Sequence, residues 1–516
     1  MTSPRHPYYV LPSAAARRRL RHPLGTLTPL LTHAPEPAEF TAYDHFDQPL
    51  RQAGRLLLAD AHGLHLLGSG GVAAHQPGKE KPGFVADLND GPVKQALAGL
   101  SPLRRLLPVG SGEWRPSTLA LVDDEGKTHC RVHSIWLRTR ENDAIVLLRL
   151  QELKGYGSSF KLLCEHIDAL GGQAGGFHNL YERLFPNTVA YDARPEIPIA
   201  DDATAFETAN RIISTHIPVM RANESGIIAD HDTEFLHDYR IQLRKIRSVL
   251  SLFKGVYTDD QTAALKAAFS ALAEPTGALR DLDVYLLDER QYHGLLPEAL
   301  HDGLDALSDT LRRKRAEAHA QVARHLLSRA YEREITALAR RFSKKGALKP
   351  GLDAGRLAPE FARDCIWKRY RKVRKTANAI DAHTPDAAVH ALRIHCKKLR
   401  YLIEFFGPLF PPKELEKVLR PLKALQNNLG RFNDCSVQQD KLHGLLRRSG
   451  EDAGGDAPRI GPSVGALITI LHGLQKKERA KVVRSVRRFD RATTRRTFSE
   501  LFQPRKKDED HCLLLE

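Results

Sequence analysis

A short basic stretch occurs twice in the chain, and this internal repeat constrains the fold more than any other feature. The first copy begins at His237 and the second at His390, and the difference between these residue numbers gives an offset of 153. The same offset carries Arg240, Arg244, Lys245, Arg247 and Phe253 onto Arg393, Lys397, Lys398, Arg400 and Phe406. The match runs without gaps from residue 237 to residue 284. A repeat at a fixed period indicates two related structural units with the same elements.

Each copy has the periodicity of an amphipathic helix. At 100° per residue, His237, Arg240, Arg244 and Arg247 fall within an arc of roughly 80°, and apolar side chains fill the opposite side. Asp238 is the only acidic residue between 237 and 247, so neighbours three and four positions apart are like charges, which destabilise an isolated helix by a few tenths of a kcal/mol per pair. With a rise of 1.5 Å per residue the stripe is roughly 15 Å long, enough for several phosphate groups in a row.

The basic stripe has two interpretations. A single basic amphipathic helix is usually a solvated surface. A packed helix needs its apolar period to be repeated but does not need five basic positions to be repeated, so the duplicated stripe favours an anion-binding site. One histidine at a helix start is weaker evidence, because such a residue is more often solvated or buried than bound to a ligand. The candidate site residues are His237, Arg240, Arg244, Lys245, Arg247, His390, Arg393, Lys397, Lys398 and Arg400.

The composition indicates a polyanionic partner. The 516 residues carry a formal net charge of +16 with a pI near 9.5, which favours nucleic acid, polyphosphate or an anionic membrane surface. A chain of this length is expected to form two or three domains. Its six cysteines form no C-x-x-C pair and no ligand-like spacing with histidine, so we expect reduced thiols, no metal site and no cofactor in a cytoplasmic protein. The sequence has no apolar leader and no run of about 18 apolar residues, so neither secretion nor membrane insertion is expected.

Residues 1–185 are predicted to form a mixed α and β domain. Apolar and β-forming runs recur at 40–46, 54–60, 64–67, 117–122, 129–137 and 144–151. Helical patterns cover 92–107 and 158–170, and the composition of 68–83 predicts a long mobile loop. The glycines between 171 and 176 follow a helix rather than a strand, so they indicate a helix stop and not a dinucleotide site.

A proline-bearing linker at 186–200 separates this domain from an all-α domain at 201–505, and residues 506–516 form a C-terminal tail. From residue 203 onward most of the sequence fits a period of 3.6 residues, with interruptions that divide it into about eight helices. Four helices in each repeat, at about 201–350 and 351–505, predict two four-helix bundles related by a pseudo-twofold axis.

The paired helices resemble a known family. Together with the segment Gly277-x-x-Arg280-Asp281-Leu-Asp283-Val and its counterpart Leu429-Gly430-x-x-Asn433-Asp434, they are similar to the conserved-histidine α-helical domain (CHAD) family over roughly 200–505. The resemblance implies two four-helix halves that bind inorganic polyphosphate in a basic central cleft, without a chemical step. It assigns the phosphate contacts to the ten candidate site residues and gives Asp281 and Asp434 at most an orienting role.

The N-terminal domain resembles a second family. The twelve residues from Tyr43 to Gly54 are similar to the YFDTP segment of the CYTH family, the triphosphate tunnel enzymes, which are understood to use an opening E-x-E-x-K for a divalent metal and tunnel arginines and lysines for triphosphate. Here the opening strand at 6–11 has no carboxylate. The expected basic positions fall on Leu58, Asp60 and near Gly68, and the late-element matches are Glu152 and Lys154. The resemblance therefore implies a degenerate tunnel-like domain without catalysis, because the metal that would neutralise the phosphate oxygens lacks ligands.

The predicted function is binding of inorganic polyphosphate by a protein that is not an enzyme, expected in the cytoplasm on polyphosphate granules with granule-associated proteins as further partners. Affinity should fall with salt, because counterions are displaced, and as the pH rises from about 6 to 8, because histidines lose protons. Two alternatives stay open: a nucleic-acid-binding protein, and a triphosphate hydrolase or cyclase in the first domain. The basic segment at 367–372 is either a second wall of the cleft or a solvated face.

Overall fold

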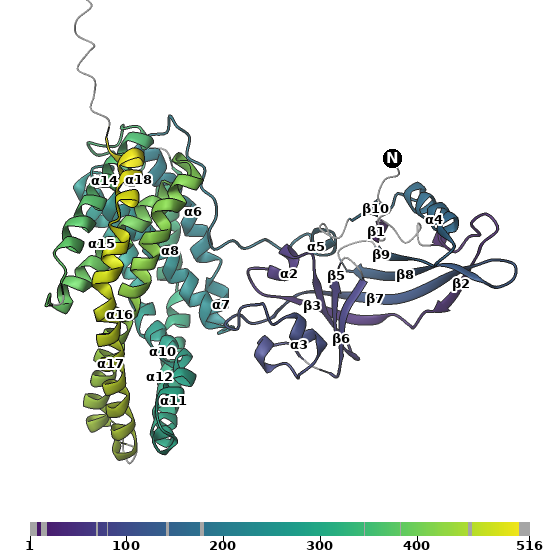
Figure 1. Ribbon diagram of the computed structural model, residues 1–516, viewed down its shortest axis with the longest axis horizontal. Helices are drawn as coiled ribbons and strands as arrows, with labels where there is room; N and C mark the ends of the chain where they lie inside the picture. Colours follow the sequence, from purple (N-terminus) through teal and green to yellow (C-terminus); the bar gives the residue numbers. More distant parts are fainter. Residues whose placement is uncertain are drawn as a thin grey trace, which may run out of the picture. The chain divides into compact units, whose positions relative to one another are not determined.

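The chain forms two compact units, Met1–Ala193 and Arg194–Glu516, and the division between them lies inside the segment 186–200. The N-terminal unit is built on a β-sheet and the C-terminal unit is helical (Figure 1). The tail expected at 506–516 lies outside the described residues. The computed structural model describes residues 8–11, 18–68, 71–79, 81–140, 144–175, 180–344, 346–381, 383–452 and 457–504.

The described residues of the N-terminal unit form a ten-stranded antiparallel sheet. The strand order is β10-β1-β9-β8-β7-β3-β4-β5-β6, and β2 pairs with β7 beside this path. The strands are β1 Tyr8–Leu11, β2 Thr28–His33, β3 Ala38–Asp44, β4 Leu56–Ala59, β5 Gly63–Gly68, β6 Gly71–Pro77, β7 Leu107–Val122, β8 Thr128–Thr139, β9 Ile145–Glu152 and β10 Gln173–Ala174. The short helices near the sheet are α2 Pro49–Gln52, η1 Val85–Asp87 and α3 Pro92–Ala96.

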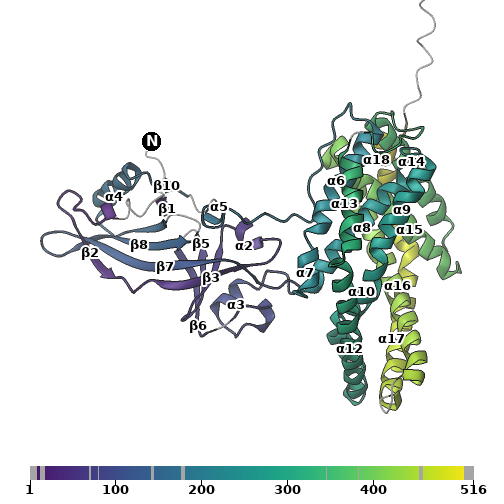
Figure 2. The same cartoon turned by 180° about the vertical axis from the view of Figure 1, so that it is seen from behind.

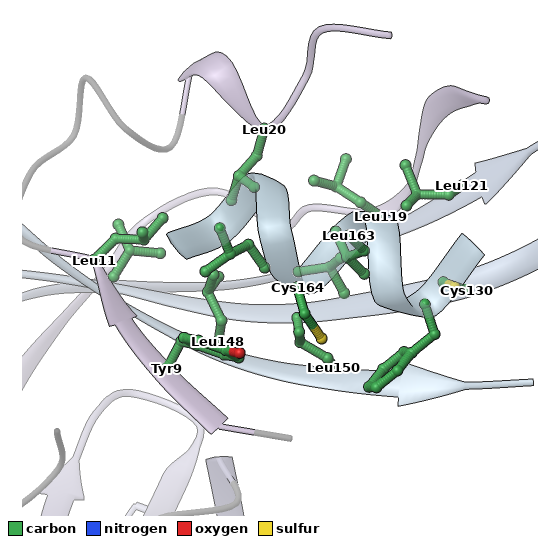
Figure 3. Packing of buried hydrophobic residues seen from close by; sticks show 14 of the residues in the cluster. Tyr9, Leu11, Leu20, Leu119, Leu121, Cys130, Leu148, Leu150, Leu163 and Cys164 are labelled. Atoms are coloured by element: carbon green, nitrogen blue, oxygen red, sulfur yellow. The ribbon is translucent and has the colours of Figure 1, made fainter. Parts of the chain in front are cut away.

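Both faces of the sheet are covered, because its strands place apolar side chains alternately on either side. Tyr9 and Leu11 of β1 belong to one buried cluster, and Val10 between them belongs to another. Helix α4, Gly157–Ala169, packs on the first cluster (Figure 3). Helix α5, Leu180–Leu184, packs on the second. The part of the second face that lies under α5 is therefore filled by apolar residues, while His133 and Arg149 lie farther along the same face.

The prediction of a long mobile loop at 68–83 is wrong over much of this segment. Residues Gly71–Pro77 form β6, which pairs with β5, while residues 69, 70 and 80 lie outside the described part. Glycine and proline indicated a loop, but β5 is almost completely buried and offers β6 a partner for its backbone hydrogen bonds. The helix predicted at 92–107 is also too long, because α3 ends at Ala96 and β7 begins at Leu107.

The described residues of the C-terminal unit form thirteen α-helices, more than the eight expected. The number is higher because short turns interrupt segments whose 3.6-residue periodicity continues across the turn. In the first repeat Pro275 lies in the 3-10 turn η3, Glu274–Thr276, which separates α9 from α10, whereas the second repeat continues as the long helix α16. The helices are α6 Ala205–Arg221, α7 Glu224–Ile228, α8 Thr233–Leu252, α9 Asp259–Ala273, α10 Gly277–Leu287, α11 Glu289–Leu295, α12 His301–Leu326, α13 Arg329–Ser343, α14 Ala358–Asn378, α15 Asp386–Phe405, α16 Pro412–Asp452, α17 Ala457–Phe489 and α18 Ala492–Phe502.

The internal repeat is preserved in the helix boundaries. Helices α8 and α15 each have 20 residues, and both ends of one are separated from those of the other by the repeat offset. The first residues of α6 and α14, Ala205 and Ala358, are separated by the same offset. The repeats meet where Phe253 stacks on its equivalent Phe406, with ring centroids 4.7 Å apart and 10° between the ring planes. Contact between equivalent residues is expected close to a local twofold axis.

A second apolar contact joins the repeats away from this stack. Leu304 and Leu307 of α12 belong to the same buried cluster as Val464 and Leu467 of α17. Helix α12 contacts α17, and α16 and α17 run side by side (Figure 2). None of the helices in the described part of the chain has the length and apolar character needed to cross a membrane.

The aromatic stack predicts a large stability effect. Phe406 is completely buried against Phe253, so Phe406→Ala leaves a cavity between the repeats and should lower the free energy of unfolding by about 3–5 kcal/mol. Denaturant unfolding of the purified chain measures this change. Phe406→Leu, which keeps most of the buried volume, should cost less than half as much. A loss below about 1 kcal/mol for Phe406→Ala would show that the stack is not a structural contact.

Candidate anion-binding site

Helices α8 and α15 expose the two predicted stripes because their opposite faces are buried. Helix α8 buries Leu243, Ile246 and Val249, and α15 buries the corresponding apolar residues of the second repeat. Arg244, Arg247 and His390 are exposed, and the other seven candidate residues are partly buried. The apolar period therefore fixes which side chains of these two helices face solvent.

The stripes converge where α8 and α15 contact each other. Burial, and then the positive charges of Arg393 and Arg244, lower the pKa of Lys397 to about 8. Arg244 and Lys397 are repeat equivalents, so each approaches its own counterpart. Arg240 has a lowered pKa for the same reasons, burial first and then Arg244, with smaller contributions from Arg280 and Arg247. We define the α8–α15 cationic cluster as Arg240, Arg244, Arg247, Arg280, Arg393, Lys397 and Arg400.

Three arginines of this cluster are held in place by neighbouring groups. Arg240 donates to the carbonyl oxygen of Ala273 at 3.2 Å and to the hydroxyl of Thr276 at 2.5 Å. Arg400 pairs with Glu404 at 2.9 Å and donates to the side-chain oxygen of Gln426 at 3.2 Å. The guanidinium of Arg393 lies 3.8 Å from the carboxylate of Asp434. Within the described part of the chain, the side chains of Arg244, Arg247, Arg280 and Lys397 form no ion pair or hydrogen bond, so these four are the available cations of the cluster.

The two aspartates of the paired motifs make different contacts. Asp281 of α10 pairs with Lys441 of α16 at 2.8 Å and so links the two repeats. Asp434 lies near Arg393 of its own repeat. Arg280, which sequence reasoning placed in the motif but not among the site residues, contributes its charge to the cluster. The position of Arg280 next to Asp281 in the paired motif is the sequence feature that could have identified it as a site residue.

Lys245 and Lys398 lie on other sides of their helices. Each follows a cluster residue by one position, which rotates its side chain by about 100°. Lys245 lies beside the buried His216 of α6. The pKa of His216 is lowered to about 3, first by burial and then by the charge of Lys245. Lys398 lies beside Arg369 and Lys372 of α14. The structure thus brings together six of the ten candidates, while His237 and His390 are the fifth residues of α8 and α15.

A second group of basic residues surrounds Lys398. Arg369 of the segment 367–372 has its guanidinium nitrogen 3.5 Å from Nδ1 of His395 on α15. Burial, then Arg369, Lys372, Lys254 and Lys266, lower the pKa of Lys398. We define the α14–α15 cationic cluster as Lys254, Lys266, Arg369, Lys372, His395 and Lys398.

The N-terminal unit contains a cavity of about 240 Å³ between its strands, lined partly by Val10, Ile135 and Leu147 and partly by Ser117 and His133. Leu58 is fully buried in the apolar cluster of the second face. Asp60 accepts a hydrogen bond from the indole nitrogen of Trp114 at 3.0 Å, and both Glu152 and Lys154 are exposed. Over the described residues of both units, no three His, Cys, Asp or Glu side chains are grouped as metal ligands.

Comparisons with known proteins identify one of these regions. Residues 211–443 match the family model of the CHAD domain, within the C-terminal unit. The chain is 26% identical over 246 residues to uncharacterized proteins from two strains of Mycobacterium tuberculosis; this alignment covers 46% of the chain and 45% of each relative, so the chain spans less than half of their length.

Two solved structures are similar to the chain. The CHAD domain from the plant Ricinus communis is 26% identical, covers 57% of this chain and 95% of its own, and has a TM-score of 0.47. PptA from Streptomyces chartreusis is 14% identical, covers 55% of this chain and 99% of its own, and has a TM-score of 0.43.

The crowded cations predict a stability gain from removing one of them. The pKa of Lys397 is about 8 in the folded protein and near 10.5 when unfolded, so its charge opposes folding fully below pH 8 and ceases to do so above about pH 10.5. Lys397→Gln should therefore raise the free energy of unfolding by on the order of 1 kcal/mol at pH 7, after allowance for solvent screening, and this gain should shrink between pH 8 and 10.5. Denaturant unfolding at several pH values measures it. The control Arg333→Gln, on the exposed face of α13, should change stability little. A variant less stable than the wild type at pH 7 would contradict the expected repulsion.

Proposed function

We propose that the CHAD domain of residues 211–443 binds inorganic polyphosphate through the α8–α15 cationic cluster. The observation that carries the proposal is the approach of Arg244 to its repeat equivalent Lys397, which joins two basic stripes into one surface. A polyanion laid across this surface would neutralise charges that repel each other in the free protein. The CHAD resemblance supports the same ligand, since members of the family are understood to bind polyphosphate.

The side chains of the cluster suit a chain of phosphates. Arginine offers forked donors that match phosphate oxygens, and lysine adds a compact charge. Arg240, Arg393 and Arg400 are already oriented by neighbouring groups, so little side-chain entropy would be lost when they bind. Arg244, Arg247 and Lys397 would supply the charges that are not compensated in the free protein. His237 and His390 would extend the surface by one helical turn at each end.

The aromatic residues of the two helices favour polyphosphate over nucleic acid. Recognition of single strands commonly uses exposed aromatic rings on which bases stack. Tyr239 of α8 is completely buried, with its hydroxyl 3.2 Å from that of Tyr331. Tyr401 of α15 is partly exposed and has no aromatic equivalent at Ser248 of α8. Competition with RNA of equal phosphate content distinguishes the two ligands, because RNA that displaces polyphosphate efficiently would favour the nucleic-acid alternative.

We also propose that residues 1–185 are a degenerate tunnel-like domain without hydrolase or cyclase activity. Leu58 stands where the CYTH resemblance expects a basic residue, and it is buried among apolar side chains. A triphosphate at this place would lose its hydration without gaining a cation. We further propose that the protein binds polyphosphate in the cytoplasm at polyphosphate granules, and that its N-terminal unit contacts a granule-associated protein.

The binding proposal predicts a specific loss on substitution. Arg244→Ala/Lys397→Ala removes two cations that hold no structural contact, so the affinity for long-chain polyphosphate should fall by about tenfold or more at 0.15 M salt, and the slope of log K against log salt should become shallower by about 1.5. Fluorescence titration at several salt concentrations measures both values. Arg329→Ala/Arg333→Ala, which removes two exposed charges from α13, is the matched control and should bind almost as the wild type does. Salt-insensitive binding, or equal losses in both variants, would reject the cluster as the site.

The N-terminal proposal predicts no turnover. Incubation of the full chain with tripolyphosphate and magnesium or manganese should release no orthophosphate above the buffer rate, since the ligands for such a metal are missing from the opening strand. A colorimetric phosphate assay measures this release. Turnover that Glu152→Ala/Lys154→Ala abolishes would instead assign a hydrolase to the N-terminal unit.

A further inference from the structure

The two repeats differ sharply around the positions equivalent to the α14–α15 cationic cluster. The repeat offset relates Arg369 to His216, Lys372 to Val219, His395 to Gln242, Lys254 to Gly407 and Lys266 to Leu419. His216 is buried, and its pKa of about 3 keeps it neutral. Of the six positions, only Lys398 retains a charged equivalent, Lys245. The six positions are therefore basic in one place, whereas their equivalents are neutral except for Lys245.

The α14–α15 cationic cluster is held together by helix geometry. Arg369 and Lys372 are three residues apart on α14, and His395 and Lys398 are three apart on α15, so each pair lies on one helix face. The 3.5 Å approach of Arg369 to His395 joins the two faces. Lys254 follows Phe253, whose ring stacks at the end of α15, and thus brings a cation of the first repeat to the same surface.

This surface begins where the first cluster ends. Lys397 belongs to the α8–α15 cationic cluster and Lys398 to the α14–α15 cationic cluster, so their side chains project about 100° apart from neighbouring positions. On a helix 10–12 Å across, this angle corresponds to a path of roughly 10 Å. The face of α15 between the two clusters carries Ile394, which is exposed, and Tyr401, which is partly exposed. Neither residue carries a charge that would repel an anion along this path.

We propose that the α14–α15 cationic cluster is a second polyphosphate subsite, present on one side of the molecule only, which long chains reach by crossing α15 from the first cluster. The inference rests on the proposed function and adds the direction in which a long polyphosphate chain leaves the first cluster. A short oligophosphate fills the first cluster and ends there. A long chain continues past Lys398 toward α14, because among the positions equivalent to this cluster only Lys245 is charged.

Chain length is the variable that tests this subsite. Arg369→Ala/Lys372→Ala/Lys398→Ala in the full chain should weaken binding of long-chain polyphosphate about tenfold and reduce its salt slope by about 2, while tripolyphosphate binding changes by less than about twofold. Fluorescence titration with both ligands measures these values. Arg324→Ala/Arg329→Ala/Arg333→Ala removes three exposed charges elsewhere in the same unit and should leave both affinities close to the wild type.

The outcomes separate the subsite from the binding function. Equal weakening for both ligands, or no weakening for the long chain, would overturn the subsite. Loss of binding in Arg244→Ala/Lys397→Ala would still uphold the first cluster. Failure of the wild type to bind either ligand would reject the proposed function as well. Lys254→Ala/Lys372→Ala changes two exposed residues only and should reproduce part of the long-chain loss, so the test does not depend on the folding of the triple variant.

Discussion

The contact between α8 and α15 is the interaction on which the candidate site depends. These helices present like charges to each other, and each exposed pair at close range opposes their approach by about 1 kcal/mol in water. Burial of one phenylalanine side chain contributes about 1.5–3 kcal/mol. The stack of Phe253 on Phe406, together with the buried faces of both helices, therefore outweighs the repulsion between Arg244 and Lys397. Apolar packing places the cations where only an anion can compensate them.

The position of a residue relative to this contact explains how the two repeats differ. Near the contact, equivalent residues face each other, so Arg244 and Lys397 contribute to one surface and both remain basic. Farther away, equivalent positions belong to two separate surfaces. His216 and Arg369 occupy such positions. His216 is a buried neutral group, whereas Arg369 is a partly buried member of a basic cluster. A duplicated fold can thus keep one shared site and still acquire a surface that only one repeat possesses.

The sequence predicted the helices of the stripes because periodicity and an ungapped repeat both depend on local spacing. It did not separate Lys245 and Lys398 from the converging residues, since one position along a helix changes the direction of a side chain without changing its charge. Arg280 and Arg369 lie on other helices, and their approach to α8 and α15 depends on packing over long sequence distances. The repeat offset also relates His216 to Arg369, and this pair shows in the sequence alone that the two repeats differ in charge. In the N-terminal unit, the composition at Gly71–Pro77 concealed a strand whose pairing is decided by β5.

The same electrostatic cost shapes the N-terminal unit under the proposed function. A tunnel that holds triphosphate must keep several cations in a partly dehydrated interior, which is unfavourable unless the anion is present. Once the metal ligands are absent, such cations have no regular counter-charge, and apolar residues such as Leu58 stabilise the interior at lower cost. The helical unit reduces this conflict, because its cations are partly or fully exposed and water screens them in part until a ligand binds. A partly exposed cluster therefore retains like charges at a lower cost than a buried tunnel does.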